Sequence, residues 1–230
     1  MNAWSSNIIF ILLTAFVSSG TSIANSESVD SSQSWKFRVW LDDTPIGTHQ
    51  VSISTEENRK SVHTQADFDV RFLFVPVYSY SHETREFWED GCLVNIRSTT
   101  DDNGDDYFIS SMQREQGLTL ETQDGKTSLD GCVRTFAYWD IELLQSERLL
   151  NTQTGKYEKV SVINMGTGVL TVDDENIEAR QFRLVSEGVT IDLWYTSEMH
   201  WLALESVTES GAVLRYLPEK YADFGEDTES

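Results

Sequence analysis

Hydrophobic and polar residues alternate along most of the chain from Trp35 onward. The first such segment, WKFRVWL at residues 35–41, places Trp35 and Phe37 on one side and Lys36 on the other. Alternation with a period of two is typical of a β-strand that has one buried face and one face in water. We therefore expect a half-buried strand here, a turn at DDTPIG (residues 42–47), and a returning strand at THQVSIS (residues 48–54).

The longest alternating segment covers residues 66–88 and contains Pro76 near its middle. One face is mainly apolar before this proline and continues after it with polar and aromatic side chains. That face carries Phe68, Val70, Phe72, Phe74, Tyr78, Tyr80, His82, Thr84, Glu86 and Trp88. Proline cannot donate a hydrogen bond to a neighbouring strand, so we expect Pro76 to mark a bend, a bulge or an edge of the sheet.

The alternation continues to residue 217, with turn signals such as Asn103-Gly104 and Asp124-Gly125 between segments. These pairs predict antiparallel hairpins. One segment differs: residues 138–155 are rich in Leu, Gln and Glu, which favours a short helix over residues 140–150 with Asp140 as its N-cap. We find no internal repeat and no linker. The pattern predicts one antiparallel all-β domain of about a dozen strands with one short helix.

The first 24 residues resemble an export signal. Residues 8–17, IIFILLTAFV, form an apolar run, and Ser22 and Ala24 supply the small side chains that precede a cleavage site. The run is shorter than the roughly 20 residues of a membrane-spanning helix. No Lys or Arg precedes it, so a buried strand or a short anchor is the alternative. We expect a signal peptide at 1–24, a flexible polar leader at 25–34, the β domain at 35–217, an acidic flexible tail at 218–230, and a periplasmic or secreted protein with no membrane span in its mature form.

The chain carries a net charge of −21. This negative field repels phosphate backbones and anionic headgroups, which excludes nucleic acids and membrane surfaces as partners held by charge. Its two cysteines, Cys92 and Cys132, are an isolated pair. In an exported protein such a pair predicts a disulfide, and two buried thiols or half of a metal site are the alternatives. We predict the disulfide, because no histidine stands at ligand spacing.

The acidic stretch at residues 101–106, DDNGDD, resembles a cation-binding loop only superficially. An EF-hand places Gly at position 6 and Glu at position 12. Counted from Asp101, the glycine falls at position 4, and position 12 is Met112. Asn103-Gly104 instead favours a type I′ turn, since both of its central residues need positive φ. We predict a turn, with weak cation binding as the alternative, and no metal site or cofactor.

Several segments also resemble a family of exported bacterial proteins that is known only as a domain of unknown function. They include WKFRVWLDDTPIGTH (residues 35–49), FDVRFLFVPVYSYSHETREFWEDGCL (residues 68–93), TTDDNG, CVRTFAYWD, LLNTQTGKY and IDLWYTSEMHWLALES. The resemblance implies a periplasmic protein but no activity and no catalytic residues. More distantly, the layout is similar to the curved half-barrels of lipoprotein carriers, which implies a single strongly curved sheet, as a half-barrel or open barrel, around an apolar cavity.

The candidate ligand pocket consists of seven polar and aromatic residues. Strand parity places His82 and Glu86 on one face among aromatic rings, where they could orient a ligand or transfer protons. The alternative is a buried polar pair that only satisfies its own hydrogen bonds. By the same parity, Asp192 and Trp194 share one face of a later strand, and Ile191, Leu193 and Tyr195 share the other. The full set is Tyr78, Tyr80, His82, Glu86, Trp88, Asp192 and Trp194.

We expect a non-enzymatic exported protein that binds an acyl chain or another small amphiphile in an apolar cavity of the curved sheet. The aromatic faces motivate this hypothesis, although core packing or a sugar-stacking surface would also use tryptophans. An envelope module that pairs with a partner protein is the alternative, and an unrecognised hydrolase is the second. No sequence motif supports the hydrolase, and the oligomeric state stays open.

Overall fold

The computed structural model describes residues 31–72, 75–172, 175–208 and 210–219. The expected signal peptide, most of the expected leader and most of the expected acidic tail lie outside these residues. Within them, thirteen strands form one antiparallel sheet in the order β11-β12-β13-β14-β15-β1-β2-β3-β4-β5-β6-β7-β8, and β9 and β10 form a second, two-stranded sheet. No helix in this part of the chain is long and apolar enough to cross a membrane.

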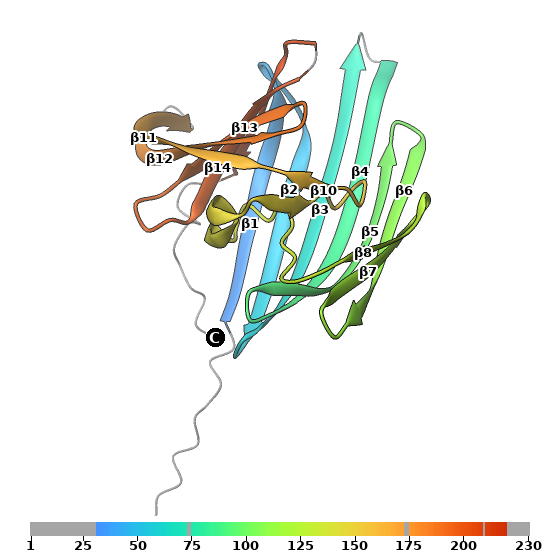
Figure 1. Ribbon diagram of the computed structural model, residues 1–230. Helices are drawn as coiled ribbons and strands as arrows, with labels where there is room; N and C mark the ends of the chain where they lie inside the picture. Colours follow the sequence, from blue (N-terminus) through green and yellow to red (C-terminus); the bar gives the residue numbers. More distant parts are fainter. Residues whose placement is uncertain (1–30, 73–74, 173–174, 209, 220–230) are drawn as a thin grey trace, which may run out of the picture.

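The strands of the large sheet are β1 (Ser31–Leu41), β2 (Thr44–Glu56), β3 (Arg59–Phe72), β4 (Val75–Glu89), β5 (Cys92–Asp102), β6 (Asp105–Arg114), β7 (Gly117–Thr122), β8 (Gly125–Leu129), β11 (Ser161–Val172), β12 (Glu175–Ser186), β13 (Val189–Tyr195), β14 (Trp201–Val207) and β15 (Val213–Pro218). The small sheet contains β9 (Arg148–Leu150) and β10 (Tyr157–Lys159). The sheet is strongly curved, and no pairing among the described residues joins β8 to β11, so it is an open barrel (Figure 1). The predicted fold class is confirmed.

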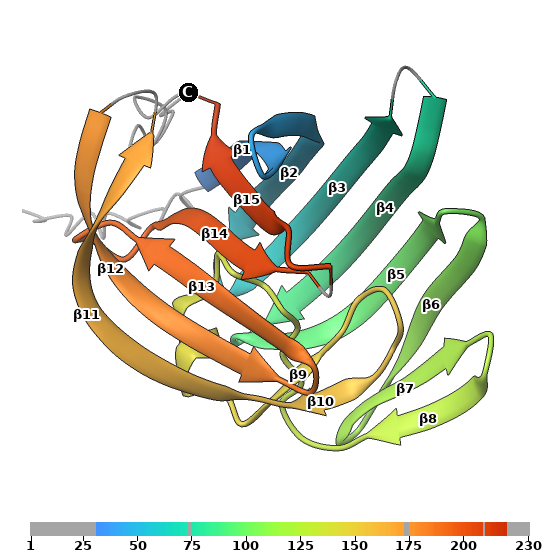
Figure 2. The ribbon, with the colours of Figure 1, turned by 90° about the horizontal axis from the view of Figure 1, so that it is seen from above.

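The sheet departs from a simple meander in one strand pairing and in one chain connection. β15 pairs with β1, so the last described strand lies beside the first. The chain also leaves β8 at one edge of the sheet and enters β11 at the other edge. The connecting residues 130–160, which we call the strap, cross the concave side of the sheet (Figure 2). The strap therefore occupies the space that the curvature would otherwise leave open.

The disulfide predicted between Cys92 and Cys132 is present and ties the start of β5 to the start of the strap. Close to it, the Leu93 amide donates a hydrogen bond to the Val133 carbonyl (2.9 Å). A backbone bridge between Thr135 and Leu150 holds the two ends of the strap's helical part together. The strap is thus fixed to the sheet covalently at one end and by backbone contacts along its length.

Three local predictions are confirmed. The Val70–Arg71 step of β3 faces a bulge beside Pro76 in β4, because Pro76 has no amide hydrogen to donate. Asn103 (φ 55°) and Gly104 (φ 95°) form the two-residue turn between β5 and β6. The side chain of Asp140 accepts a hydrogen bond from the Glu142 amide and so caps a helix.

Three boundaries differ from the prediction. The helix is a 3₁₀ helix over Ile141–Gln145, and Arg148–Leu150 form strand β9 instead of its last turn. Apolar residues at 143, 144, 149 and 150 do not follow a helical spacing, and Leu149 and Leu150 are both fully buried at adjacent positions. β1 begins at Ser31, because the polar residues 31–34 pair with β2 by backbone hydrogen bonds that need no apolar side chain. At the other end, Pro218 still belongs to β15.

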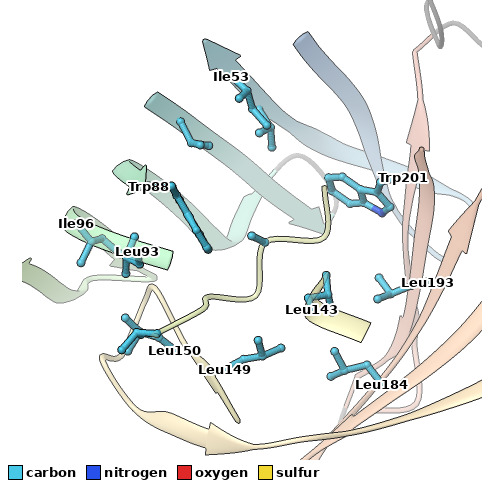
Figure 3. Close-up of a cluster of buried hydrophobic side chains, with 14 of the residues drawn as sticks. Ile53, Trp88, Leu93, Ile96, Leu143, Leu149, Leu150, Leu184, Leu193 and Trp201 are labelled. Atoms are coloured by element: carbon cyan, nitrogen blue, oxygen red, sulfur yellow. The ribbon is translucent and has the colours of Figure 1, made fainter. Parts of the chain in front are cut away.

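The main core lies between the concave face of the sheet and the strap. In Figure 3, Leu143, Leu149 and Leu150 of the strap lie between Leu93 and Ile96 on one side and Leu184 and Leu193 on the other. The three strap leucines are fully buried. Each such side chain contributes about 1.5–3 kcal/mol to the free energy of folding. The strap is thus an integral layer of the core.

A second, smaller cluster lies on the opposite face of the C-terminal strands. It contains Val172, Ile177, Ala179 and Leu202, with Trp194 packed against it. Both clusters share one continuous sheet. The C-terminal half of the sheet therefore carries hydrophobic packing on both of its faces.

Candidate functional site

A cavity of about 360 Å³ remains between the concave face of the sheet and the strap. Its sheet side is built by inward-facing residues of β2, β3, β4 and β13–β15, and its other side by the strap. The interior of the curved sheet is consequently neither an open apolar channel nor completely filled. It is a small chamber with aromatic, aliphatic and polar walls.

His82 lines this chamber from β4 and is buried. Its Nδ1 lies 2.7 Å from the Thr100 hydroxyl, and its Nε2 lies 2.7 Å from the Thr84 hydroxyl and 3.4 Å from the Thr152 hydroxyl. Burial lowers the pKa of His82 to about 4. The imidazole is therefore neutral at pH 7, with both nitrogens held by hydroxyl groups.

Glu86 lies two residues further along the same inward face of β4 and is also buried. The indole Nε1 of Trp88 donates a hydrogen bond to its carboxyl group (2.9 Å), and Thr135 of the strap forms a second one. Burial raises the pKa of Glu86 to about 7, although both hydrogen bonds act in the opposite direction. Near neutral pH this carboxyl group is thus easily converted between its acid and its anion.

His49 of β2 also lines the chamber, and the sequence argument did not single it out. Its ring packs against those of Trp201 (6.0 Å between centroids) and Tyr216 (5.1 Å). Its Nδ1 is enclosed and has no hydrogen-bond partner. Burial, with a smaller contribution from His82, lowers the pKa of His49 to about 3. The signal was present in the sequence, because the alternation places His49 on the same face as Val51 and Ile53.

The strap contributes the polar groups opposite β4. The Tyr80 hydroxyl donates a hydrogen bond to Gln153 Oε1 (3.2 Å). Glu158 of β10 accepts hydrogen bonds from Asn151 Nδ2 (3.0 Å) and from the Ser186 hydroxyl. Tyr138 lines the chamber as well, and its carbonyl accepts a hydrogen bond from the Tyr195 hydroxyl (2.9 Å). No local sequence pattern connects these strap residues to β4. The strap runs from one edge of the sheet to the other and is brought opposite β4 only by the tertiary fold.

The seven residues of the predicted pocket separate into four groups. Tyr80, His82 and Glu86 line the chamber. Trp88 belongs to the core and acts on the chamber only through Glu86. Tyr78 lies further along β4, where its hydroxyl donates a hydrogen bond to Asp102 (2.7 Å).

Asp192 and Trp194 lie away from the chamber, on the opposite face of β13. Asp192 forms a two-point ion pair with Arg183 of β12, with both N–O distances 2.7 Å. Trp194 packs against the second hydrophobic cluster. Strand parity correctly separated these two residues from Ile191, Leu193 and Tyr195, but it could not tell which face is concave.

Polar side chains of the chamber are held by hydrogen bonds to one another. In the part of the chain that the structure describes, no group of three or more His, Cys, Asp or Glu residues is placed to hold a metal ion. His82 and Glu86 both have threonine or tryptophan partners instead of bonding to each other. The chamber therefore presents a set of fixed hydrogen-bonding groups among aromatic rings.

Fold and site together define a class: an all-β open barrel in which an internal strap forms one wall of a small chamber. By sequence, the chain belongs to the family described as Domain of unknown function (DUF6134), which it matches over residues 37–219. No curated protein matches the sequence.

One solved structure with a similar fold is a "Beta-barrel-like Protein of Domain of Unknown Function DUF1849" from Brucella abortus. The sequences are 9% identical, the TM-score is 0.60, and the similarity covers 84% of this chain and 98% of that chain. At this identity the likeness concerns the fold alone.

Proposed function

We propose that this protein is an exported, non-enzymatic binding protein that holds a small amphiphile in the chamber beneath the strap. The observation that carries the proposal is the chamber itself, in which aromatic rings and fixed hydrogen-bonding groups face one space between the sheet and the strap. Small-molecule sites in proteins have this composition, with mainly apolar walls and a few fixed polar groups.

The size of the chamber limits the size of the ligand that it can hold. Its 360 Å³ lies near the lower end of the range of about 300–1,000 Å³ that small-molecule pockets occupy. A single short apolar arm fits this volume better than a lipid with two acyl chains. The unpartnered Nδ1 of His49 adds an unsatisfied polar group in the wall, which is costly in an apolar setting.

Export is supported by two features. The apolar run at residues 8–17 followed by small residues is typical of a signal peptide. The Cys92–Cys132 disulfide is the expected state of a cysteine pair outside the reducing cytosol. A fusion of residues 1–34 to a reporter that is active only after export tests this part of the proposal, with deletion of residues 8–17 as the control.

Binding is tested by extracting purified protein with organic solvent and identifying any released small molecule by mass spectrometry. In parallel, 1-octanol is titrated while the fluorescence of the chamber tryptophans, Trp139 and Trp201, is recorded. Thr64→Phe fills the chamber from β3 and should abolish the fluorescence change. Gln65→Phe, at the next and exposed position of β3, is the matched control and should leave it intact. Equal responses of both variants would exclude the chamber as the binding site.

A second candidate function, an envelope module that pairs with an extended strand of a partner protein, is favoured by the edge strand β11. Among the described residues β11 pairs only with β12, and Ile163, Met165 and Val169 on it are exposed. Its sequence contains no charged residue, although charges normally protect such edges. A photo-crosslinking residue at Ile163 should capture one defined partner in cells, whereas the same residue at Thr127 of the other edge strand, β8, should not.

A further inference from the structure

The wall of the chamber is unusual in its balance of charge. Three glutamates line it: Glu86, Glu158 and Glu187. Among the residues that the structure describes, no lysine and no arginine lines it, and its two histidines are held neutral at pH 7 by burial. An anionic ligand placed here would lose its hydration without gaining a counter-charge, and such an unpaired buried charge is strongly unfavourable.

Two arginines of the C-terminal strands are engaged in ion pairs outside the chamber wall. Arg183 pairs with Asp192 on the opposite face of the sheet, and Arg215 pairs with Glu205 (3.2 Å). Lys60 is outside the wall, and its ammonium lies 5.1 Å from the centre of the Trp139 ring. The contact of Lys60 with Trp139 shows that a ring of this wall already accepts an ammonium group at its face.

Six aromatic rings also line the chamber. The chamber is lined by Tyr80, Phe136, Tyr138, Trp139, Trp201 and Tyr216. The face of an aromatic ring carries partial negative charge and attracts ammonium groups, most strongly where water is excluded. Rings and carboxyl groups together therefore favour a positive charge inside the chamber and disfavour a negative one.

The two inner carboxyl groups are fixed in position. Glu158 is held by Asn151 and Ser186, and Glu86 by Trp88 and Thr135. Carboxyl groups that are already oriented lose little conformational freedom when a cation binds. They come from different sides of the chamber, since Glu86 is on β4 and Glu158 is on the strap.

We infer that the ligand of this chamber is a cation, a protonated amine or a quaternary ammonium with one short apolar arm. The ammonium lies among the aromatic rings and the carboxyl groups of Glu86 and Glu158, and the arm lies against the aliphatic wall formed by Val51, Ile191 and Leu204. This inference rests on the proposed binding function, and it replaces the fatty acid that an acyl-binding carrier would hold.

The test compares three probes that share an octyl chain and differ in charge: octyltrimethylammonium, 1-octanol and octanoate. Binding to the full-length mature protein is measured by calorimetry and by tryptophan fluorescence. We expect octyltrimethylammonium to bind about tenfold more tightly than 1-octanol, with octanoate weakest. Equal or tighter binding of 1-octanol or octanoate would overturn the inference while leaving the proposed binding function intact. Failure of all three probes, with nothing extracted from the purified protein, would overturn both.

Variants separate a specific site from general attraction to a protein of net charge −21. Glu158→Gln and Glu86→Gln should each weaken octyltrimethylammonium binding about tenfold and leave 1-octanol binding unchanged. Glu178→Gln, an exposed position on β12, removes the same charge from the surface and should change neither. If Glu178→Gln weakens cation binding as much as Glu158→Gln, the attraction is nonspecific and the inference is wrong. Because Glu86 is buried, its variant is compared only after a matching circular dichroism spectrum confirms its fold.

Discussion

Glu86 and His82 face the same chamber from one strand, yet each is satisfied by its own set of neighbours. Both have pKa values moved toward their neutral forms, Glu86 to about 7 and His82 to about 4. The cause is burial in both cases, and it acts in opposite directions because one group is an acid and the other a base. The inner face of β4 is consequently polar without carrying a fixed charge at slightly acidic pH.

Replacing Glu86 should change how stability depends on pH. The carboxyl group has a pKa of 4.5 in the unfolded chain and about 7 in the folded one. Between these values the folded protein binds more protons, so the free energy of unfolding falls as pH rises, by about 3 kcal/mol in total above pH 7. Glu86→Gln removes this pH-dependent loss of stability, because glutamine does not ionise. Its amide oxygen can still accept the hydrogen bond from the Trp88 indole.

We expect Glu86→Gln to be more stable than the parent protein at pH 8, by up to about 3 kcal/mol, and to show no such gain at pH 4. Urea unfolding at both pH values measures this difference. Glu178→Gln, at an exposed position, should show no pH-dependent gain. If the difference in free energy of unfolding between Glu86→Gln and the parent protein is the same at pH 4 and pH 8, the pKa of Glu86 is not raised in the folded protein.

Gly47 of β2 illustrates a residue whose identity is set by a backbone contact. A Cβ atom at this position would lie 1.9 Å from the carbonyl oxygen of Asp67 on β3. Gly47→Ala should therefore force the two strands apart and lower the free energy of unfolding by about 1–3 kcal/mol. Thr48→Ala, at the next residue, should cost less than about 0.5 kcal/mol. Chemical denaturation of both variants measures the contrast, and equal losses would mean that β2 and β3 can separate without cost.

At the scale of elements, the alternating pattern predicted most strands and most hairpins correctly. Asn103-Gly104 and Pro76 were read correctly because their backbone restrictions are local. The helix was predicted too long because the composition of residues 140–150 favours helix, whereas tertiary packing selects strand β9 for its last residues. At these residues the burial of Leu149 and Leu150 outweighs the local preference for helix.

The strap is the element that the pattern described least well, and it forms one wall of the chamber. Residues 130–160 show neither period two nor period 3.6, because their apolar side chains enter an interior that surrounds them on several sides. Tyr138 and Glu158 therefore gave no signal as chamber residues. Only the cysteine pair indicated that residue 132 lies next to residue 92.

The Cys92–Cys132 disulfide should stabilise the strap against the sheet. It closes a loop with a sequence separation of 40 residues, for which the chain-entropy estimate is about 4 kcal/mol. We expect the double variant Cys92→Ser/Cys132→Ser to lose about 2–4 kcal/mol of stability and to exchange amide hydrogens faster in residues 130–160. Amides of β2 and β3 serve as the internal control. Unchanged exchange in the strap would show that backbone and leucine contacts hold it alone.

At the scale of the whole molecule, the order of strands could not be read from the sequence. Alternation identifies which residues face inward, but it does not state which distant strand becomes a neighbour. The β1–β15 pairing and the crossing from β8 to β11 are both of this long-range kind. For the same reason the set of residues around the chamber was predicted only where one strand, β4, contributes several of them.

The net charge of −21 should make the stability of the whole molecule depend on salt. Like charges repel one another more in the compact state than in the unfolded chain. Raising sodium chloride from about 0.01 M to about 0.3 M shortens the screening length from about 30 Å to less than 8 Å. We therefore expect the thermal midpoint to rise with salt at pH 8, as measured by circular dichroism.

Near pH 4.4, where the net charge approaches zero, the same addition of salt should have a much smaller effect. A midpoint that falls with salt at pH 8 would mean that the ion pairs on the surface outweigh the overall repulsion. The exposed pairs Arg59–Glu89 and Arg71–Asp69 are examples of such contacts.

The neighbour relation between β1 and β15 also constrains the order of events when the chain is made. Ser31–Leu41 leaves the ribosome long before Val213–Pro218, the strand that must lie beside it. Until then one edge of β1 has no partner, and the sheet is incomplete. A nascent chain thus lacks the seam between β1 and β15 until β15 has been made, so the edge of β1 stays unpaired while the strands between them in the sequence are synthesised.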